Sequence, residues 1–224
     1  MVNSEKEYES MLKSFLDAGF DTSFCEYLYL NNIKGNNWDA FTGFNKAIHI
    51  ANGEYLILCH QDVRIEFDNV TNLFERIDEI SSLDSNWCVL GNAGGASNLH
   101  DVYIRISDPN MENVSKGPFP TKVECLDENF IILNAKYGLR FSEDLSGYHF
   151  YGTDICQQAR FRGLNSYVIN FHLRHLSSGK TDSIYESSFQ SLIHNYRNKL
   201  APRFMRETTN LRLYLTGSKW KSII

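Results

Sequence analysis

The sequence predicts an α/β domain in which helices flank a mixed, mostly parallel sheet. Stretches with helical periodicity alternate with short apolar runs along the first half of the chain. The first two helical stretches end at Gly19 and at Asn52-Gly53, which are residues that commonly end helices. A chain of 224 residues can bury one substantial core, so a single domain is the default expectation.

The clearest unit of this pattern runs from Gly43 to Ile65. From just before this unit onward, apolar residues recur at helical spacing, at Ala40, Phe44, Ala47, Ile48 and Ala51. After the Asn-Gly turn, the apolar run Tyr55–Cys59 is typical of a strand covered on both faces. Because ligands of open parallel sheets bind beyond the carboxyl ends of the strands, Asp62 in the following His-Gln-Asp is a candidate site residue.

The remaining elements follow from the same criteria. We expect helices over 5–18 and 69–81, and a short helix that starts near Asp154 and ends before Gly163. Further strands are expected at 24–30, 87–90, 123–133 (interrupted by polar residues 127–129) and 166–173, with loops and a small hairpin over 96–122. Only Met1-Val2-Asn3 precede the first helix, which is typical of the last residues of a strand. The predicted sheet therefore lacks most of its first strand.

The composition is that of an ordinary soluble chain, with 42% hydrophobic and 22% charged residues. No apolar run approaches the roughly 20 residues of a membrane span, and the first ten residues do not resemble a secretory signal, so a cytoplasmic location is expected. The five cysteines are widely spaced and lie largely in apolar runs, which favours small buried side chains over a zinc site or a disulfide framework.

The charge is distributed unevenly, although the net charge is −5. Residues 194–224 hold seven Lys or Arg against Glu207 alone, about +6, which leaves about −11 for the rest. We therefore divide the chain into a domain over 1–180 and a basic, partly helical tail over 181–224. Apolar residues of the tail, including Tyr185, Phe189 and Trp220, allow it either to rest on an anionic membrane or to pack on its own domain.

Five polar residues are candidates for chemistry, and each has a simpler alternative role. Asp62 could bind a divalent cation or cap a turn. Asp127 and Glu128 could hold a sugar hydroxyl or be solvated in a loop. Asp154 could be a general base or cap a helix. His175 could complete a metal site with Asp62 or be an ordinary paired histidine.

Several short motifs follow one another along the chain. They are Asn31-Asn32, Phe44–Ala47, Ala51–Tyr55, His60–Asp62, Leu126–Phe130, His149–Asp154 and His175–Gly179. In this combination the chain resembles bacterial glycosyltransferases with the nucleotide-sugar-binding, Rossmann-like GT-A fold, close to the inverting family 2. The resemblance extends from Asn3 to about Gly179.

The resemblance implies roles for individual residues. Asp62 and His175 would bind Mn²⁺ or Mg²⁺, and Asp154 would be the catalytic base. The donor and the other substrate groups would be bound by Asn3, Asn31, Asn45, Gln61, Asp127, Glu128 and His149. In such a mechanism the cation neutralises charge on the leaving diphosphate while the base deprotonates the acceptor hydroxyl.

Three features depart from the family pattern. His60 stands in place of the first Asp of Asp-X-Asp, so fewer carboxylates would bind the metal. Thr153 stands in place of the Glu of Glu-Asp, which leaves Asp154 as the base candidate there. The first strand, which carries base-binding residues in this fold, is almost wholly missing.

The leading hypothesis is a metal-dependent glycosyltransferase that uses a UDP-sugar to extend a glycan or a lipid-linked acceptor. It would work in the cytoplasm or at the inner face of the membrane, through its tail, with no nucleic-acid partner. The first alternative is a protein of this fold that has lost catalysis and serves as a binding or assembly subunit. The second is a nucleotidyltransferase, against which the lack of an early glycine-rich phosphate loop argues.

Overall fold

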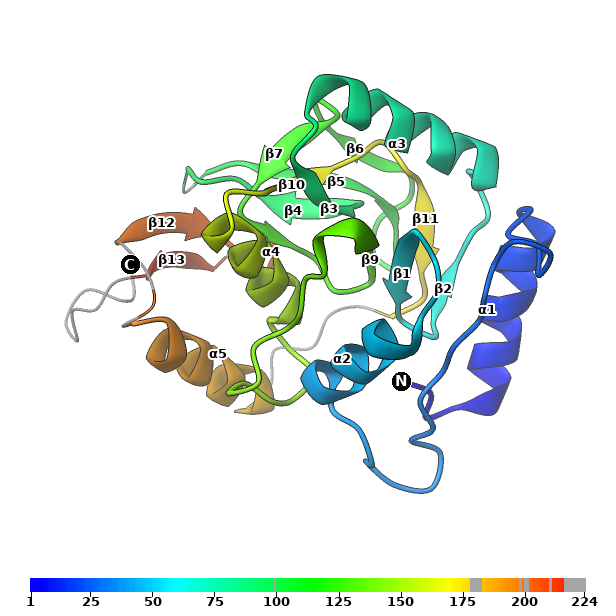
Figure 1. Cartoon of the computed structure of the whole chain (residues 1–224), viewed down its shortest axis with the longest axis horizontal. Helices are drawn as coiled ribbons and strands as arrows, with labels where there is room; N and C mark the ends of the chain where they lie inside the picture. The colour runs from blue at the N-terminus through cyan, green and yellow to red at the C-terminus, as the bar shows by residue number, and fades with distance from the viewer. Residues whose placement is uncertain (99, 178–182, 198, 200–201, 210, 216–224) are drawn as a thin grey trace.

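The computed structural model describes residues 1–98, 100–177, 183–197, 199, 202–209 and 211–215, and it is a mixed α/β structure (Figure 1). The helices of this part of the chain are α1 (Glu5–Asp17), α2 (Ala40–Ile50), α3 (Val70–Leu83), α4 (Tyr151–Phe161) and α5 (Ser183–Tyr196). The strands are β1 (Tyr55–Cys59), β2 (Val63–Arg64), β3 (Trp87–Gly91), β4 (Ala93–Gly95), β5 (Val102–Ser107), β6 (Val114–Lys116), β7 (Thr121–Val123), β8 (Cys125–Leu126), β9 (Phe130–Asn134), β10 (Asn165–Val168), β11 (Leu173–His175), β12 (Arg203–Arg206) and β13 (Arg212–Leu215).

The strands form two larger sheets and one hairpin. The first sheet has the order β1-β9-β3-β10-β7, and the second has the order β2-β11-β5-β4-β8 with β6 on β5. Of the pairings among the described strands, β3–β10 and β5–β11 are parallel and the others are antiparallel. The prediction of a mostly parallel sheet is therefore wrong.

The cause of this error is the position of β9. The connection through α3 does bring β1 and β3 into the same direction, as the alternation of helices and strands predicts. However, β9 lies between them and runs antiparallel to both, with Ile132 opposite Ile57 on one side and Leu90 on the other. An antiparallel neighbour needs no helical crossover, so the helix pattern does not reveal it.

Two predicted strands also differ from the structure. Residues 24–30 form no regular strand; their end meets the N-terminus in an isolated parallel bridge between Val2 and Asn31. The run 166–173 is not one strand, because β10 ends at Val168 in the first sheet and β11 begins at Leu173 in the second.

Local sequence explains the helix ends that position the site. The Ser4 side chain caps α1 by accepting from the Glu7 amide, and Asp39 caps α2 by accepting from the Phe41 and Thr42 amides. Asn69 and Asn72 cap α3 reciprocally. Gly19 follows α1 with φ +86°, a left-handed conformation that glycine adopts without strain.

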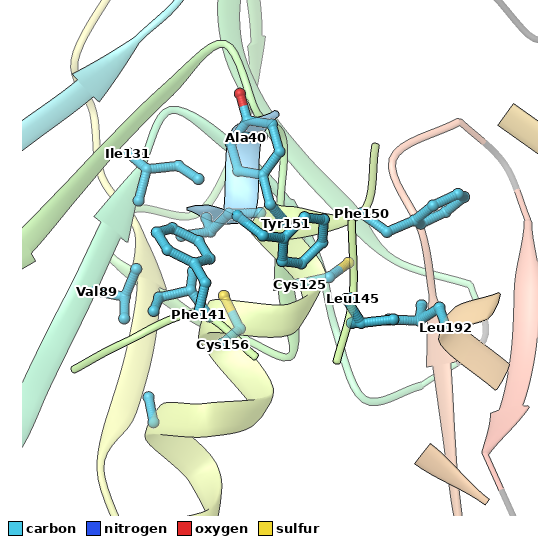
Figure 2. Close-up of a cluster of buried hydrophobic side chains, with 14 of the residues drawn as sticks. Ala40, Val89, Cys125, Ile131, Phe141, Leu145, Phe150, Tyr151, Cys156 and Leu192 are labelled. Carbon is cyan, nitrogen blue, oxygen red and sulfur yellow. The ribbon is translucent and has the colours of Figure 1, made fainter. Parts of the chain in front are cut away.

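The core lies on both faces of the first sheet. On one face, Leu56, Val89 and Ile131 pack with α2, α4 and α5, and Figure 2 shows Ala40, Phe141 and Tyr151 in this cluster. On the other face, Leu90, Phe130 and Ile132 pack with α1 and α3. Three of the cysteines, Cys88, Cys125 and Cys156, are buried; Cys25 and Cys59 are half-buried, and none of the five is in a disulfide.

The described part of the tail packs on its own domain. Five apolar residues of α5 are buried in the first cluster: Tyr185, Phe189, Leu192, Ile193 and Tyr196. The basic stretch after Pro202 forms the β12–β13 hairpin. Lys219, Trp220 and Lys221 lie outside the described residues. Within the described ranges, no helix has the length and apolar character needed to cross a membrane.

The hairpin docks on the second sheet at a glycine. The Arg206 carbonyl lies directly over Gly95, where a Cβ would overlap it, and the Cys125 thiol approaches the same carbonyl at 3.1 Å. The Gly95→Ala change should lower the free energy of unfolding in urea by about 1–3 kcal/mol, because the hairpin must move away from the sheet.

A second glycine provides the control. A Cβ at Gly43 in α2 would meet only flexible ends of side chains, at 2.9 Å from the Met1 sulfur and 3.0 Å from Leu30 Cδ1, before Trp38 Cβ at 3.4 Å. Gly43→Ala also gains helix propensity, so the free energy of unfolding of this variant should stay within about 1 kcal/mol of that of the original chain. Equal losses in the two variants would contradict the proposed docking.

Candidate functional site

Three strand ends bring His60, Asp62 and His175 together. His60 follows β1, and its amide donates to the Asn129 carbonyl at 3.0 Å, which extends the β1–β9 ladder by one bond. Asp62 directly precedes β2, and His175 ends β11, opposite Val63 of β2. The Leu176 amide donates to the Asp62 carbonyl at 3.0 Å and closes the corner. Backbone hydrogen bonds thus hold His175 next to Asp62, although the two residues are more than a hundred positions apart in the sequence.

The three side chains form a compact triad, and each offers one metal-ligating atom. The Asp62 carboxylate oxygen lies 3.4 Å from His175 Nε2 and 3.9 Å from His60 Nδ1, and the two nitrogens are 3.3 Å apart. Bonds of about 2.1 Å to a common ion would separate cis ligands by roughly 3.0–3.4 Å. The triad therefore fits a divalent cation after a small adjustment of the His60 ring.

Burial and mutual charge set the protonation of the triad. Burial, together with the neighbouring His175, lowers the pKa of His60 to about 4. Burial alone would lower the pKa of His175 as well, but the hydrogen bond and charge of Asp62 raise it above its ordinary value. Burial would raise the pKa of Asp62, yet hydrogen bonds from His175 and Ser177 hold it well below its usual range. Without a metal, the Asp62 carboxylate therefore favours the protonated form of His175.

Tyr151, which the sequence did not single out, orients the His60 ring. Its hydroxyl donates to the Glu128 carbonyl at 2.9 Å and lies 2.9 Å from His60 Nε2. A hydroxyl that gives its proton to a carbonyl accepts one from Nε2, and this tautomer leaves Nδ1 free to bind a cation. Such hydrogen bonds behind a metal ligand fix the orientation of its ring. The aromatic run 148–151 gave no sign of this role.

Gln61 and Asn3, both predicted to bind the nucleotide, bind each other. The Gln61 side-chain oxygen accepts from the Asn3 amide at 3.1 Å and from the Ser4 amide at 3.2 Å, and its NH₂ group contacts the Asn3 side chain. This contact ties the start of α1 to the residue next to Asp62. The two residues are brought together beside the triad.

Other predicted nucleotide contacts have local structural partners. The Asn45 amide group donates to the Phe141 carbonyl at 3.0 Å and accepts from the Phe141 amide at 2.9 Å. Both of its polar atoms are therefore used to hold the chain after β9, and its role in nucleotide binding stays a prediction. Asn31 is exposed beside Val2 and accepts from the Ile33 amide at 2.9 Å. His149 packs edge-on against Tyr185, at 5.3 Å between ring centres.

Asp127 and Glu128 lie next to the triad, in the turn that leads into β9. The charge of Asp127 acts on both His60 and His175, and its half-buried carboxylate accepts from the Asn129 amide at 2.9 Å. The Glu128 carboxylate accepts from the amides of Phe150 and Gly152 at the start of α4. Burial and the charges of Asp127 and Glu207 raise the pKa of Glu128.

Asp154 has surroundings that do not suit the predicted catalytic base. Its side chain is 0% exposed. The carboxylate accepts from the Ser142 amide at 2.8 Å, from the Ser142 hydroxyl at 2.6 Å and from the Tyr196 hydroxyl. It thereby joins α4, α5 and the chain after β9 from within, and burial raises its pKa. In this structure Asp154 is a buried structural carboxylate, and its role as catalytic base stays a prediction.

Comparison with known proteins finds a relative that matches nearly the whole chain. The chain is 30% identical over 227 aligned residues to the "ATP synthase subunits region ORF 6" protein of Fuscovulum blasticum, a match that covers 99% of this chain and 91% of that protein. No family model matches the sequence. The solved structure titled "Crystal Structure of A197 from STIV" is 13% identical, with a TM-score of 0.43 over 74% of this chain and 79% of that one.

The triad predicts a specific titration. By ¹H–¹³C NMR at its ring carbons, His60 should titrate near pH 4 and His175 above its ordinary 6.5. Because His60 stays neutral down to about pH 4 while an unfolded histidine gains its proton near pH 6.5, its contribution to stability is lost as the pH falls between these values. In Asp62→Asn the pKa of His175 should fall, because the hydrogen bond and charge that raise it are lost. An unshifted His175 would contradict the pairing.

The Asp154 network predicts a loss of stability. Asp154→Asn places an NH₂ donor against the Ser142 or Tyr196 donors, which should cost about 1–3 kcal/mol in urea unfolding. Tyr196→Phe removes one donor from the same carboxylate, so the double variant should lose less than the sum of the single losses. If Asp154→Asn instead kept full stability and lost only activity, the buried structural role would be wrong.

Proposed function

We propose a function for this chain, which belongs to the family of the ORF 6 protein of Fuscovulum blasticum: it is a metal-dependent glycosyltransferase of the GT-A class. It would transfer a sugar from a UDP-sugar to a hydroxyl of a glycan or lipid-linked acceptor. The observation that carries the proposal is the His60–Asp62–His175 triad, in which three metal-ligating atoms lie within 4.8 Å of one another at the end of β1. The sequence motifs described above supply the substrate class.

The donor set favours Mn²⁺ over Mg²⁺. Imidazole nitrogen suits first-row transition metals, whereas Mg²⁺ is bound mainly by oxygen ligands. Two nitrogens and one carboxylate leave further coordination positions for other ligands, and diphosphate oxygens of a donor can occupy them. A cation held there would offset the charge that develops on the leaving diphosphate.

Asp127 is the better candidate for accepting the proton of the acceptor hydroxyl. Asp154 is enclosed in its own network, whereas the half-buried carboxylate of Asp127 is close enough to the triad to influence both histidines. A base beside the metal can act on a hydroxyl that attacks the donor sugar. Glu128 would keep the neighbouring turn in place through its bonds to the start of α4.

The burial of Asp154 also favours a second candidate, a binding subunit without catalysis. Such a protein would use the same triad to hold a metal and a nucleotide but would transfer nothing. The two proposals agree on metal binding and differ only on turnover, so one set of variants separates them.

Metal binding is the first test. Mn²⁺ titrated by electron paramagnetic resonance and by thermal shift should bind the original chain and His49→Ala equally, since His49 is an exposed residue of α2 and is not part of the triad. Asp62→Asn and His175→Ala should each bind about 10-fold or more weaker, because each removes one of three ligands. A saturating ion raises the melting temperature, and this rise should vanish in the two site variants. Unchanged Mn²⁺ affinity in both would overturn the metal site.

Turnover is the second test, with UDP release measured across a panel of UDP-sugars in the presence of Mn²⁺. The original chain and His49→Ala should release UDP. Asp127→Asn should bind Mn²⁺ and UDP normally but should lose transfer by about 100-fold, the usual contribution of a general base. Binding of Mn²⁺ and UDP with no release from any donor would favour the binding subunit.

A further inference from the structure

A polar cavity lies at the opposite end of α4 from the triad. It has a volume of about 260 Å³ and is bounded by the last turn of α4, the two residues after it, and the strands β7 and β10. The first residue of α4 is Tyr151, whose hydroxyl contacts His60, and the helix extends for about 15 Å before it reaches the cavity. No residue of the triad lines the cavity. It is therefore a separate place on the molecule.

Positive charge is in excess at this cavity. Lys122 of β7 and Arg160 of α4 line it, together with one carboxylate, that of Glu124. The Glu124 carboxylate forms an ion pair with Arg160, so its charge is already matched. Lys122 is exposed and takes part in no ion pair within the part of the chain that the structure describes. The nearby Asp84, whose pKa the Lys122 charge helps to lower, does not line the cavity.

Arg203 of β12 adds a further positive charge next to Arg160. Its guanidinium donates to the Gln157 side-chain oxygen and lies over the Phe161 ring, 5.7 Å from the ring centre. Burial and the charge of Arg160 lower the pKa of Arg203, although the charge of Glu124 opposes this effect. One carboxylate thus serves two arginines. An added anion would reduce the repulsion between the two cations.

The inner wall of the cavity carries a hydroxyl without a strong partner. Ser166 of β10 lines the cavity, lies opposite Val123 of β7 and is 3% exposed. Its hydroxyl makes no hydrogen bond to an oxygen or nitrogen among the described residues. It interacts with the thiol of Cys156, which also lines the cavity and is a weak hydrogen-bonding group. A ligand oxygen that accepts from Ser166 would therefore satisfy a buried polar group.

The set of donors favours a phosphate group. Lys122, Arg160 and Ser166 belong to three different elements, so their donors approach from different walls. A phosphate group presents three or more acceptor oxygens in different directions, whereas a carboxylate presents two in one plane. The volume of about 260 Å³ lies near the lower limit of about 300 Å³ for small-molecule cavities, so any organic part of the ligand is small.

We propose that this cavity binds a small phosphate monoester, with the phosphate group between Lys122 and Arg160 and one of its oxygens bound to the Ser166 hydroxyl. The organic part of the ligand would lie against Gly163 and Leu164, which form the remaining wall after α4. This ligand is distinct from the metal ion and the nucleotide-sugar of the proposed function, because the triad has no part in the cavity.

The test is a calorimetric titration of glycerol 3-phosphate into the metal-free full chain. The original chain should bind it, and Lys122→Gln and Ser166→Ala should each bind about 10-fold or more weakly, because each loses a donor to a charged group. Lys46→Gln is the matched control and should bind like the original, since Lys46 is an exposed residue of α2 that does not line the cavity. Equal affinity in all four chains, or no saturable binding by the original, overturns the site.

Other probes identify the group that is recognised. Inorganic phosphate should bind more weakly than glycerol 3-phosphate, and glycerol and acetate should not bind. Tighter binding of inorganic phosphate would assign the cavity to the free ion, and acetate of equal affinity would assign it to carboxylates; either result contradicts the monoester. Asp62→Asn should bind glycerol 3-phosphate like the original, and a loss of affinity in this variant would place the ligand at the triad instead.

The two cavity variants are chosen so that the test does not depend on a damaged fold. Lys122 is exposed and in no ion pair, and the Ser166 hydroxyl has only a thiol to interact with among the described residues. Both variants should therefore melt within a few degrees of the original chain. If one of them does not fold, the other decides the outcome. In the original chain the ligand should also shift the ¹H–¹⁵N signals of Gly163 and Ser166, and unchanged signals at saturation would contradict the proposed position.

Discussion

The antiparallel pairing of β1 with β9 is the constraint on which the candidate site depends. It carries the ladder one residue beyond the strand, to the bond between His60 and Asn129, and so holds the metal-binding corner against the turn that contains Asp127 and Glu128. The same turn supplies the carbonyl that receives the Tyr151 proton and thereby sets the tautomer of His60. A backbone bond thus fixes the position of His60, and a side-chain hydroxyl bound to the same turn fixes its tautomer.

The triad can persist without a cation because its charges are internally balanced. The half-buried Asp62 carboxylate favours the protonated form of His175, while burial and His175 lower the pKa of His60. A bound cation would replace the proton on His175, so metal and proton compete for the same atom. The contact of His60 Nε2 with the Tyr151 hydroxyl lies on the other side of the His60 ring and does not involve His175, so it can hold the ring in place when the proton leaves His175.

Local patterns in the sequence predicted the parts of the site that depend on neighbouring residues. Helical spacing and capping residues predicted α1, α2 and α3, and the apolar run predicted β1 with Asp62 beyond it. The insertion of β9 between β1 and β3 could not be read from spacing, because antiparallel pairing leaves no trace in the intervening chain. Asp154 shows the same limit: a helix start beside aromatic residues does not reveal that Ser142 and Tyr196 enclose its carboxylate. Tyr151 was missed because a phenol that orients another side chain has no signature of its own.

The N-terminus and the triad meet at Gln61, which connects the start of α1 to the candidate metal site. Its side chain holds the amides of Asn3 and Ser4, and its carbonyl accepts from the Arg64 guanidinium at 2.9 Å, while Arg64 also pairs with Glu7 of α1. A cation bound at the triad would therefore favour an ordered N-terminus, and an ordered N-terminus would favour cation binding, because coupling between two sites is reciprocal. The N-terminus and the candidate metal site are in this sense one structural unit.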